Sequence, residues 1–311
     1  MMIITMPIFA LLLLLLPISD SYAQPFTLMS WNMQWLSLNP KSPIVRSAAD
    51  YQALKQLFTI HSPDILAFQE VDSTEALYRV INQQHYKIYL SSRTNSPQDS
   101  FTINNQYTGF AIKHGIDIED ITDLSQLSSP AIAAGNSIPF NNKLRYGSMI
   151  RITINKQSII LLNLHLKSGC FTAKQLAQQK GKSCKTLAQQ LKLIKHWVST
   201  QQARSQPFII VGDFNHRIKS GKTFIDKITN DPTTIRHVSA AISANCTVKL
   251  ASRVTRYRTY RALIDHLFTT TNIKALDQRQ IQYDKQQISQ FTLSDHCPLL
   301  FTLAVHSSSH T

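Results

Sequence analysis

Short runs of β-branched and aromatic residues recur along the whole chain, separated by polar or helix-like segments. Runs of this length and composition are typical of buried strands. Their alternation with helical segments predicts an α/β or α+β fold built in layers. The runs that we expect to form strands are residues 26–31, 65–71, 86–90, 107–112, 149–154, 158–166, 208–211, 264–269 and 299–305.

Apolar residues recur at helical spacing in three segments between these strands, which predicts amphipathic helices there. Asp72 and Ser73 precede the second segment and are candidate caps for its helix. Apolar stripes of this kind form core, so we assign them no chemistry. The apolar positions are Leu54, Leu57 and Phe58, then Leu77, Val80 and Ile81, then Leu187, Leu191, Ile194 and Val198.

The length of the chain and its hydrophobic content set the size of the core. With 311 residues, 43% of them hydrophobic, the chain could form one large domain or two small ones. No linker rich in Gly, Ser or Pro divides it. We therefore expect residues 24–311 to form a single domain.

Residues 1–23 have the pattern of a secretory signal peptide, although they begin without a Lys or Arg. An apolar run from Pro7 to Ile18 is followed by the small-residue sequence Ser21-Tyr22-Ala23, which predicts cleavage after Ala23. A membrane anchor is the alternative, but the run is shorter than the ~20 residues that a spanning helix needs. We expect a secreted or periplasmic protein.

The chain is strongly basic, with 32 Lys and Arg against 18 Asp and Glu and a net charge of +14. Removal of residues 1–23 would take away one acidic residue, Asp20, and no basic one, which raises the charge further. Such a protein favours polyanions, which include nucleic acid, anionic membrane surfaces and phosphorylated substrates. Charge alone does not choose among them.

Four cysteines, an even number, favour disulfides in an exported chain. Four cysteines allow three pairings, and we expect Cys170 to pair with Cys184 across a short loop and Cys246 to pair with Cys297. A cysteine-rich metal site is the weaker alternative because no C-x-x-C spacing occurs.

Polar residues stand at the ends of several predicted strands. An ionised carboxylate at the end of an apolar strand is costly to desolvate unless a positive or hydrogen-bonding group compensates it. Gathered at one sheet edge, such carboxylates would bind a hard divalent cation. Mg²⁺ is favoured because it needs few protein carboxylates, with Mn²⁺ or Ca²⁺ as alternatives. The residues are Glu70, His165, Asp213, Asn215, Asp265, Asp295 and His296.

These residues lie in an ordered set of motifs that spans residues 26 to about 303. The motifs are Ser30-Trp31-Asn32, Asp64-Ile65-Leu66-Ala67-Phe68-Gln69-Glu70, Asn163-Leu164-His165-Leu166-Lys167-Ser168, Gly212-Asp213-Phe214-Asn215, Ile264-Asp265-His266 and Ser294-Asp295-His296-Cys297-Pro298. The set resembles the endonuclease/exonuclease/phosphatase superfamily, which includes deoxyribonuclease I-like enzymes and sphingomyelinases. The resemblance implies a four-layer sandwich of two packed mixed β-sheets flanked by helices.

The resemblance further implies metal-assisted hydrolysis of a phosphoric ester bond, a hydrolase activity. Asn32 and Glu70 would hold or orient the metal ion, with Asp295 nearby. Asp265 would bond one ring nitrogen of His296 and leave the other to take a proton from the attacking water, so that His296 acts as the general base. The metal ion would stabilise charge on the phosphate and help the leaving group depart.

Three other positions would contact the reacting groups. By the same resemblance, Asp213 and Asn215 would orient the water and the scissile phosphate, and His165 would donate to a phosphate oxygen. Arg145 lies where family members often place a phosphate-contacting arginine, and Lys167 follows His165 by two residues. For Arg145 and Lys167, substrate contact and an ordinary surface role both stay open.

His266 is expected to be structural, and one stretch of the chain departs from the family pattern. Alternation along the strand turns His266 away from the face that Asp265 uses, so we expect a structural role. In deoxyribonuclease I-like enzymes, a carboxylate just ahead of a strand backs the histidine at the position of His165. The corresponding stretch here contains Asn104-Asn105-Gln106-Tyr107, which puts a strict two-histidine nuclease mechanism in doubt.

Three hypotheses about the function stay open. We favour a nuclease acting on DNA or RNA because of the charge and a basic, aromatic stretch that could guide a strand or could be a solvated loop. A sphingomyelinase-like enzyme or a phosphoinositide phosphatase or phospholipase, with anionic lipid as partner, is the second. A catalytically silent nucleic-acid-binding protein is the third. We expect a monomer without an obligate protein partner. The stretch comprises Lys249, Arg253, Arg256, Tyr257, Arg258, Tyr260 and Arg261.

Overall fold

The computed structural model describes residues 24–129, 144–218, 221–250 and 255–306. The predicted signal peptide, residues 1–23, lies outside this part of the chain and stays a prediction. Within the same ranges, no helix has the length and apolar character that a membrane crossing requires.

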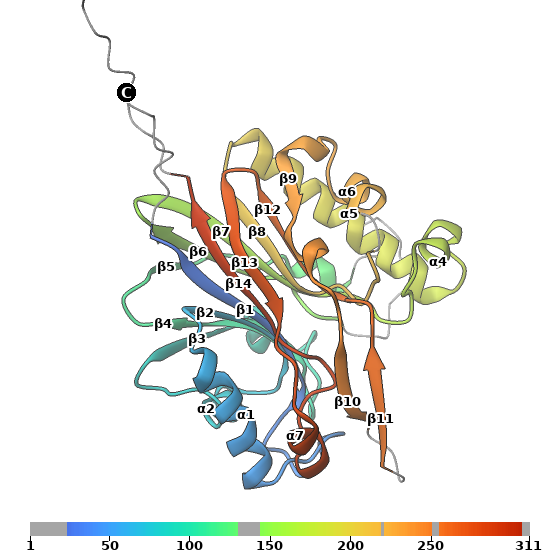
Figure 1. The fold of residues 1–311 in the computed structure, drawn as a ribbon. Helices are drawn as coiled ribbons and strands as arrows, with labels where there is room; N and C mark the ends of the chain where they lie inside the picture. Colours follow the sequence, from blue (N-terminus) through green and yellow to red (C-terminus); the bar gives the residue numbers. More distant parts are fainter. Residues whose placement is uncertain (1–23, 130–143, 219–220, 251–254, 307–311) are drawn as a thin grey trace, which may run out of the picture.

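Two mixed sheets, each of six strands among the described residues, form the centre of the molecule (Figure 1). The first has the order β13-β14-β1-β2-β4-β3, with β1 (Phe26–Leu36), β2 (Ile65–Val71), β3 (Tyr86–Leu90), β4 (Tyr107–Lys113), β13 (Ile273–Gln280) and β14 (Leu299–Val305). The second has the order β5-β6-β7-β8-β12-β9, with β5 (Asp117–Asp120), β6 (Ser148–Ile154), β7 (Gln157–His165), β8 (Phe208–Asp213), β9 (Ile235–His237) and β12 (Asp265–Thr270). A separate hairpin joins β10 (Cys246–Leu250) and β11 (Arg256–Tyr260).

Helices cover the outer faces of the sheets, and the predicted four-layer sandwich is confirmed (Figure 1). The helices beside the first sheet are α1 (Ala48–His61), α2 (Thr74–Tyr78) and α7 (Lys285–Gln290), and those beside the second are α4 (Ala173–Gln178), α5 (Lys182–Ala203) and α6 (Gly221–Ile228). Short 3₁₀ turns cover Ser92–Asn95, Ser125–Ser128, Pro232–Thr234 and Val238–Ala241.

Three apolar clusters hold the layers together. Between the sheets, alternate residues of the central strands are fully buried, among them Leu28, Ala67, Leu161 and Val211. The opposite face of each sheet packs on a long helix, α1 or α5. The predicted helical stripes are therefore core, through Leu54, Leu57 and Phe58 on α1 and through Leu187, Leu191, Ile194 and Val198 on α5.

All nine predicted strands are present, and three of them, β2, β3 and β14, have the predicted bounds. The apolar runs did not predict β5, β9, β10, β11 and β13, which are short or carry polar, partly exposed residues. One prediction was wrong in detail. The helix α2 ends at Tyr78, so Val80 and Ile81 lie beyond it, although both are buried.

The strand directions bring the functional motifs to one end of the sandwich. β1 runs parallel to β2, and β7 runs parallel to β8, so the carboxyl ends of each pair meet at one edge of their sheet. β12 is antiparallel to β8, and its first residue, Asp265, pairs with the last residue of β8, Asp213. β14 is antiparallel to β1, so the segment that precedes it, with His296, lies at the same end.

Candidate active site

The site lies across the gap between the two sheets and takes side chains from both. β1 and β2 supply Asn32 and Glu70, and the segment before β14 supplies Asp295 and His296. The second sheet supplies His165, Asp213, Asn215 and Asp265, at the end of β7, the end of β8, the following loop and the start of β12. The topology thus brings together residues that are more than two hundred positions apart in the sequence.

Asn32 joins the two sheets at the centre of the site. Its side chain is fully buried, and Nδ2 donates to Glu70 Oε1 at 3.1 Å and to Asp213 Oδ2 at 3.0 Å. Its Oδ1 accepts a hydrogen bond from the backbone N–H of Gln34 at 2.9 Å, which fixes the orientation of the amide. A single neutral side chain therefore holds two carboxylates, one from each sheet, in fixed positions.

Glu70 reaches the site because the backbone departs from regular strand geometry. The register shifts between Phe68 and Val71, and Glu70 has φ 59°, a left-handed conformation that is uncommon for a residue with a side chain. Strict alternation would place Glu70 on the face opposite Gln69, whose Nε2 donates across the gap to Asn163 Oδ1 at 2.7 Å. The bulge instead lets Glu70 Oε2 accept from Trp35 N at 3.2 Å while Oε1 faces Asn32.

Asp213 is the most connected carboxylate of the site. The glycine before it has φ 128°, and a Cβ there would lie 2.2 Å from the Leu164 carbonyl oxygen, so Gly212 is required for β8 to pack against β7. Asp213 Oδ1 accepts from Asn215 N at 2.7 Å, and Oδ2 accepts from Asn215 Nδ2 at 3.1 Å. Burial raises the pKa of Asp213 to about 7, against the opposing effect of His296. A positive charge nearby would stabilise its ionised form.

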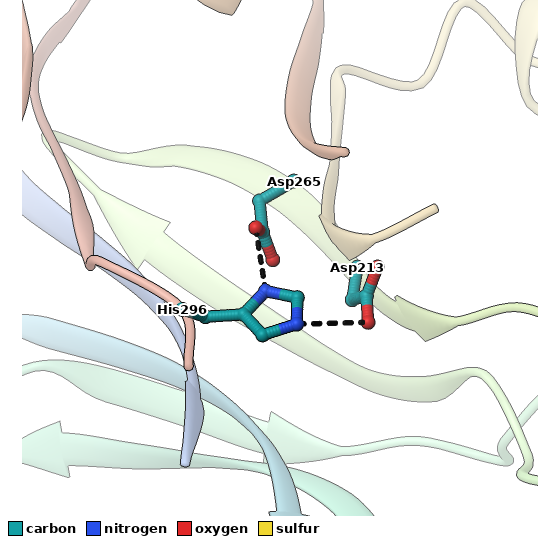
Figure 2. Close-up of side chains that lie close together, drawn as sticks. All are labelled: Asp213, Asp265 and His296. Atoms are coloured by element: carbon teal, nitrogen blue, oxygen red, sulfur yellow. Dashed lines mark hydrogen bonds and ion pairs between the residues drawn. The ribbon is translucent and has the colours of Figure 1, made fainter. Parts of the chain in front are cut away.

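His296 is oriented by Asp265, as the resemblance implied (Figure 2). Its Nδ1 donates to Asp265 Oδ2 at 2.8 Å, and its Nε2 lies 3.9 Å from Asp213 Oδ2. Burial alone would lower the pKa of His296, but Asp265 and Asp213 outweigh it and hold the pKa well above 6.5. The ring is thus fixed in the tautomer that leaves Nε2 to exchange a proton with the site.

His165 has an arginine beside it in place of a carboxylate. Arg145 bonds to both ring nitrogens, through Nε to Nδ1 at 3.0 Å and through Nη2 to Nε2. His165 Nε2 also lies 3.5 Å from both Glu70 Oε1 and Asp213 Oδ2. Burial and the charge of Arg145 lower the pKa of His165 well below 6.5, so the ring is neutral. Asn105, from the stretch that lacks the family carboxylate, bonds instead to the backbone of Phe101.

The structure places the remaining predicted residues less centrally. The backbone N–H of Asp295 donates to Gln34 Oε1 at 3.1 Å, but no hydrogen bond or ion pair among the described residues joins its carboxylate to Asn32 or Glu70. Lys167 Nζ donates to the Ser168 carbonyl at 3.0 Å. The metal-ligand role of Asp295 and the substrate role of Lys167 therefore stay predictions.

Arg46 and Tyr283 hold the segment before β14 in place. Neither residue was predicted from the sequence. Arg46 is buried, and its guanidinium donates to the Leu293 carbonyl at 2.9 Å and to the Met33 carbonyl at 3.1 Å. The Tyr283 hydroxyl donates to the His296 carbonyl and accepts from Trp31 Nε1 at 3.2 Å. The atoms that they hold in this segment are backbone carbonyls, which leave no motif in the sequence.

Both predicted disulfides, Cys170–Cys184 and Cys246–Cys297, are confirmed. The second ties the β10–β11 hairpin to the residue that follows His296. His266 faces away from the site, as alternation predicts, and its Nε2 contacts the His216 carbonyl at 2.9 Å.

The donor set fits a divalent cation. Asn32 Nδ2 bonds both Glu70 Oε1 and Asp213 Oδ2, and this neutral amide brings two carboxylates together without adding a positive charge. Asp265 Oδ1 is buried without a hydrogen bond to any residue in the described ranges. Ligand atoms of Asp213, Asp265 and His296 also lie within 4.8 Å of one another. Oxygen-rich sets of this kind suit hard cations.

The fold and the site define a hydrolase that acts on phosphoric ester bonds. The chain belongs to the Endonuclease/Exonuclease/phosphatase family, whose model matches residues 29–296. The matched range contains every predicted site residue from Asn32 to His296. A comparison with curated proteins gives no match.

Solved structures with the same fold cover nearly the whole chain. TDP2 from Caenorhabditis elegans is 18% identical, with 90% of this chain and 74% of that chain covered and a TM-score of 0.59. D. rerio TDP2 complexed with single strand DNA product is 14% identical, with 90% and 98% covered and a TM-score of 0.59. A mannosyl-6-phosphatase from Bacteroides thetaiotaomicron is 15% identical, with 89% and 99% covered and a TM-score of 0.58. At these identities the likeness concerns the fold.

Proposed function

We propose that the chain is an exported, divalent-metal-dependent nuclease that hydrolyses phosphodiester bonds of DNA or RNA. The observation that carries the proposal is the line of three side chains in Figure 2. Asp265 bonds His296 Nδ1 at 2.8 Å, and His296 Nε2 faces Asp213 at 3.9 Å. A water beside His296 and Asp213 would meet both a proton acceptor and an orienting carboxylate.

In the proposed reaction, the water oxygen attacks phosphorus while its proton moves to His296 Nε2. Asp265 keeps the Nδ1 proton in place, so Nε2 remains the acceptor, and Asp213 and Asn215 orient the water. The P–O bond to the leaving group breaks, and the leaving alkoxide gains a proton from solvent, which yields a phosphomonoester and an alcohol. When bound, a divalent cation such as Mg²⁺ stabilises negative charge on the phosphate and offsets the carboxylates that favour protonated His296.

His165 and Arg145 bind the phosphate in this proposal. His165 is kept neutral by burial and by Arg145, so it would contact the phosphate without adding a charge. Arg145 carries the charge instead, and burial lowers its pKa only to about 10, so the guanidinium is protonated at neutral pH. The pair thus supplies one cation and one neutral ring at the phosphate.

Nucleic acid is the substrate that the surface supports best. The net charge is +14, and the β10–β11 hairpin carries exposed basic and aromatic residues such as Arg256, Tyr257 and Arg258 near the site. The D. rerio TDP2 neighbour is complexed with single strand DNA product. Export is supported by the apolar run at residues 7–18 and by the pairing of all four cysteines.

A lipid phosphodiester is the second candidate, and one surface feature favours it. Leu38, Val45, Phe101 and Ile103 are large apolar side chains that are 45–60% exposed. The loops that carry them are joined by a hydrogen bond from Asn104 Nδ2 to the Lys41 carbonyl at 2.9 Å. An apolar surface of this kind could insert into a membrane.

One experiment separates these candidates. The purified protein is incubated with DNA, RNA, sphingomyelin and a phosphoinositide, with Mg²⁺ or with chelator, beside a His296→Ala variant. We expect cleavage of nucleic acid that requires both Mg²⁺ and His296. Cleavage of lipid alone would establish the second candidate, and activity that is indifferent to chelator and to the substitution would overturn the proposed mechanism.

A further inference from the structure

A cavity of about 420 Å³ adjoins the catalytic groups and is not used by the chemistry described above. Asp265, Asp295 and His296 line it together with the apolar residues 262–264. The β10–β11 hairpin and the loops after β7 and β8 supply most of the other lining residues. The volume of the cavity lies within the ~300–1,000 Å³ typical of small-molecule sites.

The lining of the cavity includes two arginines that are available to an anion. Arg217 and Arg258 both line the cavity, and neither forms an ion pair with a carboxylate in the part of the chain that the structure describes. The Arg258 guanidinium lies over the Tyr260 ring, 4.9 Å from its centroid, which restricts its position. The cavity therefore holds two arginines without an ion-pair partner among the described residues, beside the Asp265 and Asp295 carboxylates that also line it.

An aromatic ring also lines the cavity. Phe171 is 37% exposed, although the loop that carries it is well held. Its carbonyl accepts from Arg217 N at 2.8 Å, its N–H donates to Gln175 Oε1 at 3.0 Å, and it follows the Cys170–Cys184 disulfide. An exposed ring on a fixed backbone loses little conformational entropy when a flat group stacks on it.

We propose that this cavity binds the nucleotide next to the scissile phosphate, in an unpaired strand. Arg217 and Arg258 contact the neighbouring phosphate, and the base stacks on Phe171. Stacking on side chains requires a base that is not stacked in a duplex, so single-stranded nucleic acid is the preferred substrate. This inference rests on the proposed function and names its substrate class.

The test compares two substrates that share the chemistry but not the neighbouring nucleotide: a single-stranded oligonucleotide and methyl p-nitrophenyl phosphate. The variants are Arg258→Ala, Arg217→Ala and Phe171→Ala, with Arg236→Ala, an exposed arginine on the edge strand β9, as the matched control. For the oligonucleotide, each of the three is expected to raise KM roughly tenfold. For the small diester, kcat/KM should stay within about twofold of wild type because the cavity is not filled.

Salt dependence gives a second readout. Loss of one phosphate contact on a single strand should reduce the slope of log KM against log salt by about 0.7, so Arg258→Ala should change the slope and Phe171→Ala should not. Cleavage of both substrates with unchanged KM in all three variants would overturn the subsite and leave the proposed function intact. A wild-type protein that cleaves neither substrate, or lipid alone, would overturn both.

Discussion

Replacement of Asp265 by asparagine tests the general base through one hydrogen bond. Asp265 Oδ2 accepts from His296 Nδ1 at 2.8 Å, whereas an asparagine keeps the volume but can present its NH₂ group to Nδ1. The ring would then carry its proton on Nε2, which could no longer accept one from water. General-base catalysis contributes roughly 10²–10⁴-fold, so we expect kcat to fall by about that factor, or about 3–5 kcal/mol in the barrier.

The assay is steady-state hydrolysis of methyl p-nitrophenyl phosphate with saturating Mg²⁺, which separates kcat from KM. KM should change little because Asp265 does not contact the phosphate in the proposed mechanism. Asp277→Asn, an exposed carboxylate on β13 that pairs with Arg279, is the matched control and should retain wild-type kcat. An Asp265→Asn variant with a kcat within about threefold of wild type would refute the assignment of His296 as base.

Three further predictions follow from the carboxylates, the second disulfide and a buried histidine pair. Mg²⁺ should raise the Tm of the wild-type protein, and Glu70→Gln should abolish that rise; an undiminished rise would exclude Glu70 from the cation site. Cys246→Ser/Cys297→Ser should lose about 2–4 kcal/mol of stability and also lower kcat, because Cys297 follows His296. Cys170→Ser/Cys184→Ser should leave kcat largely intact, and equal kcat losses would count against this reasoning. Burial lowers the pKa of His237 from 6.5 to about 4 and that of His266 to about 3. Both rings are neutral in the folded protein, whereas the same histidines in the unfolded chain take up protons below about pH 6.5. The free energy of unfolding that the neutral rings contribute above that pH is therefore lost as the pH falls toward 4. The free energy of unfolding, measured with urea at pH 7 and at pH 5, should decrease between these pH values by about 2 kcal/mol less in His237→Gln than in the wild-type protein. An identical decrease in both proteins would contradict the neutral state of His237 in the fold.

The sequence predicted those strands whose own residues form a recognisable apolar run. β2 (Ile65–Val71) is an almost continuous apolar run buried on both faces, so its bounds could be predicted. β11 (Arg256–Tyr260) has a polar sequence and becomes a strand because it pairs with β10, which no local pattern encodes. Tertiary pairing of this kind decides the edge strands.

The site divides in the same way. The family resemblance, carried by motifs at strand ends, implied the bond between Asp265 and His296, which the structure contains. The contact between Arg145 and His165 depends on how β6 and the loop before it pack against β7, so its geometry could not be inferred from spacing. The left-handed conformation of Glu70 could not be predicted from the sequence either, because a bulge depends on the register of the neighbouring strands.

The bridge made by Asn32 has a consequence for how the protein loses activity. Asn32 and Glu70 belong to one sheet and Asp213 to the other, so hydrogen bonds of 3.0–3.1 Å depend on the spacing of two separate sheets. A small slip of one sheet over the other would separate the carboxylates while every strand stayed paired. On gradual heating, turnover should therefore cease before circular dichroism records any loss of β-structure, and enlarging the space between the sheets, as in Leu161→Ala, should widen that interval of temperature.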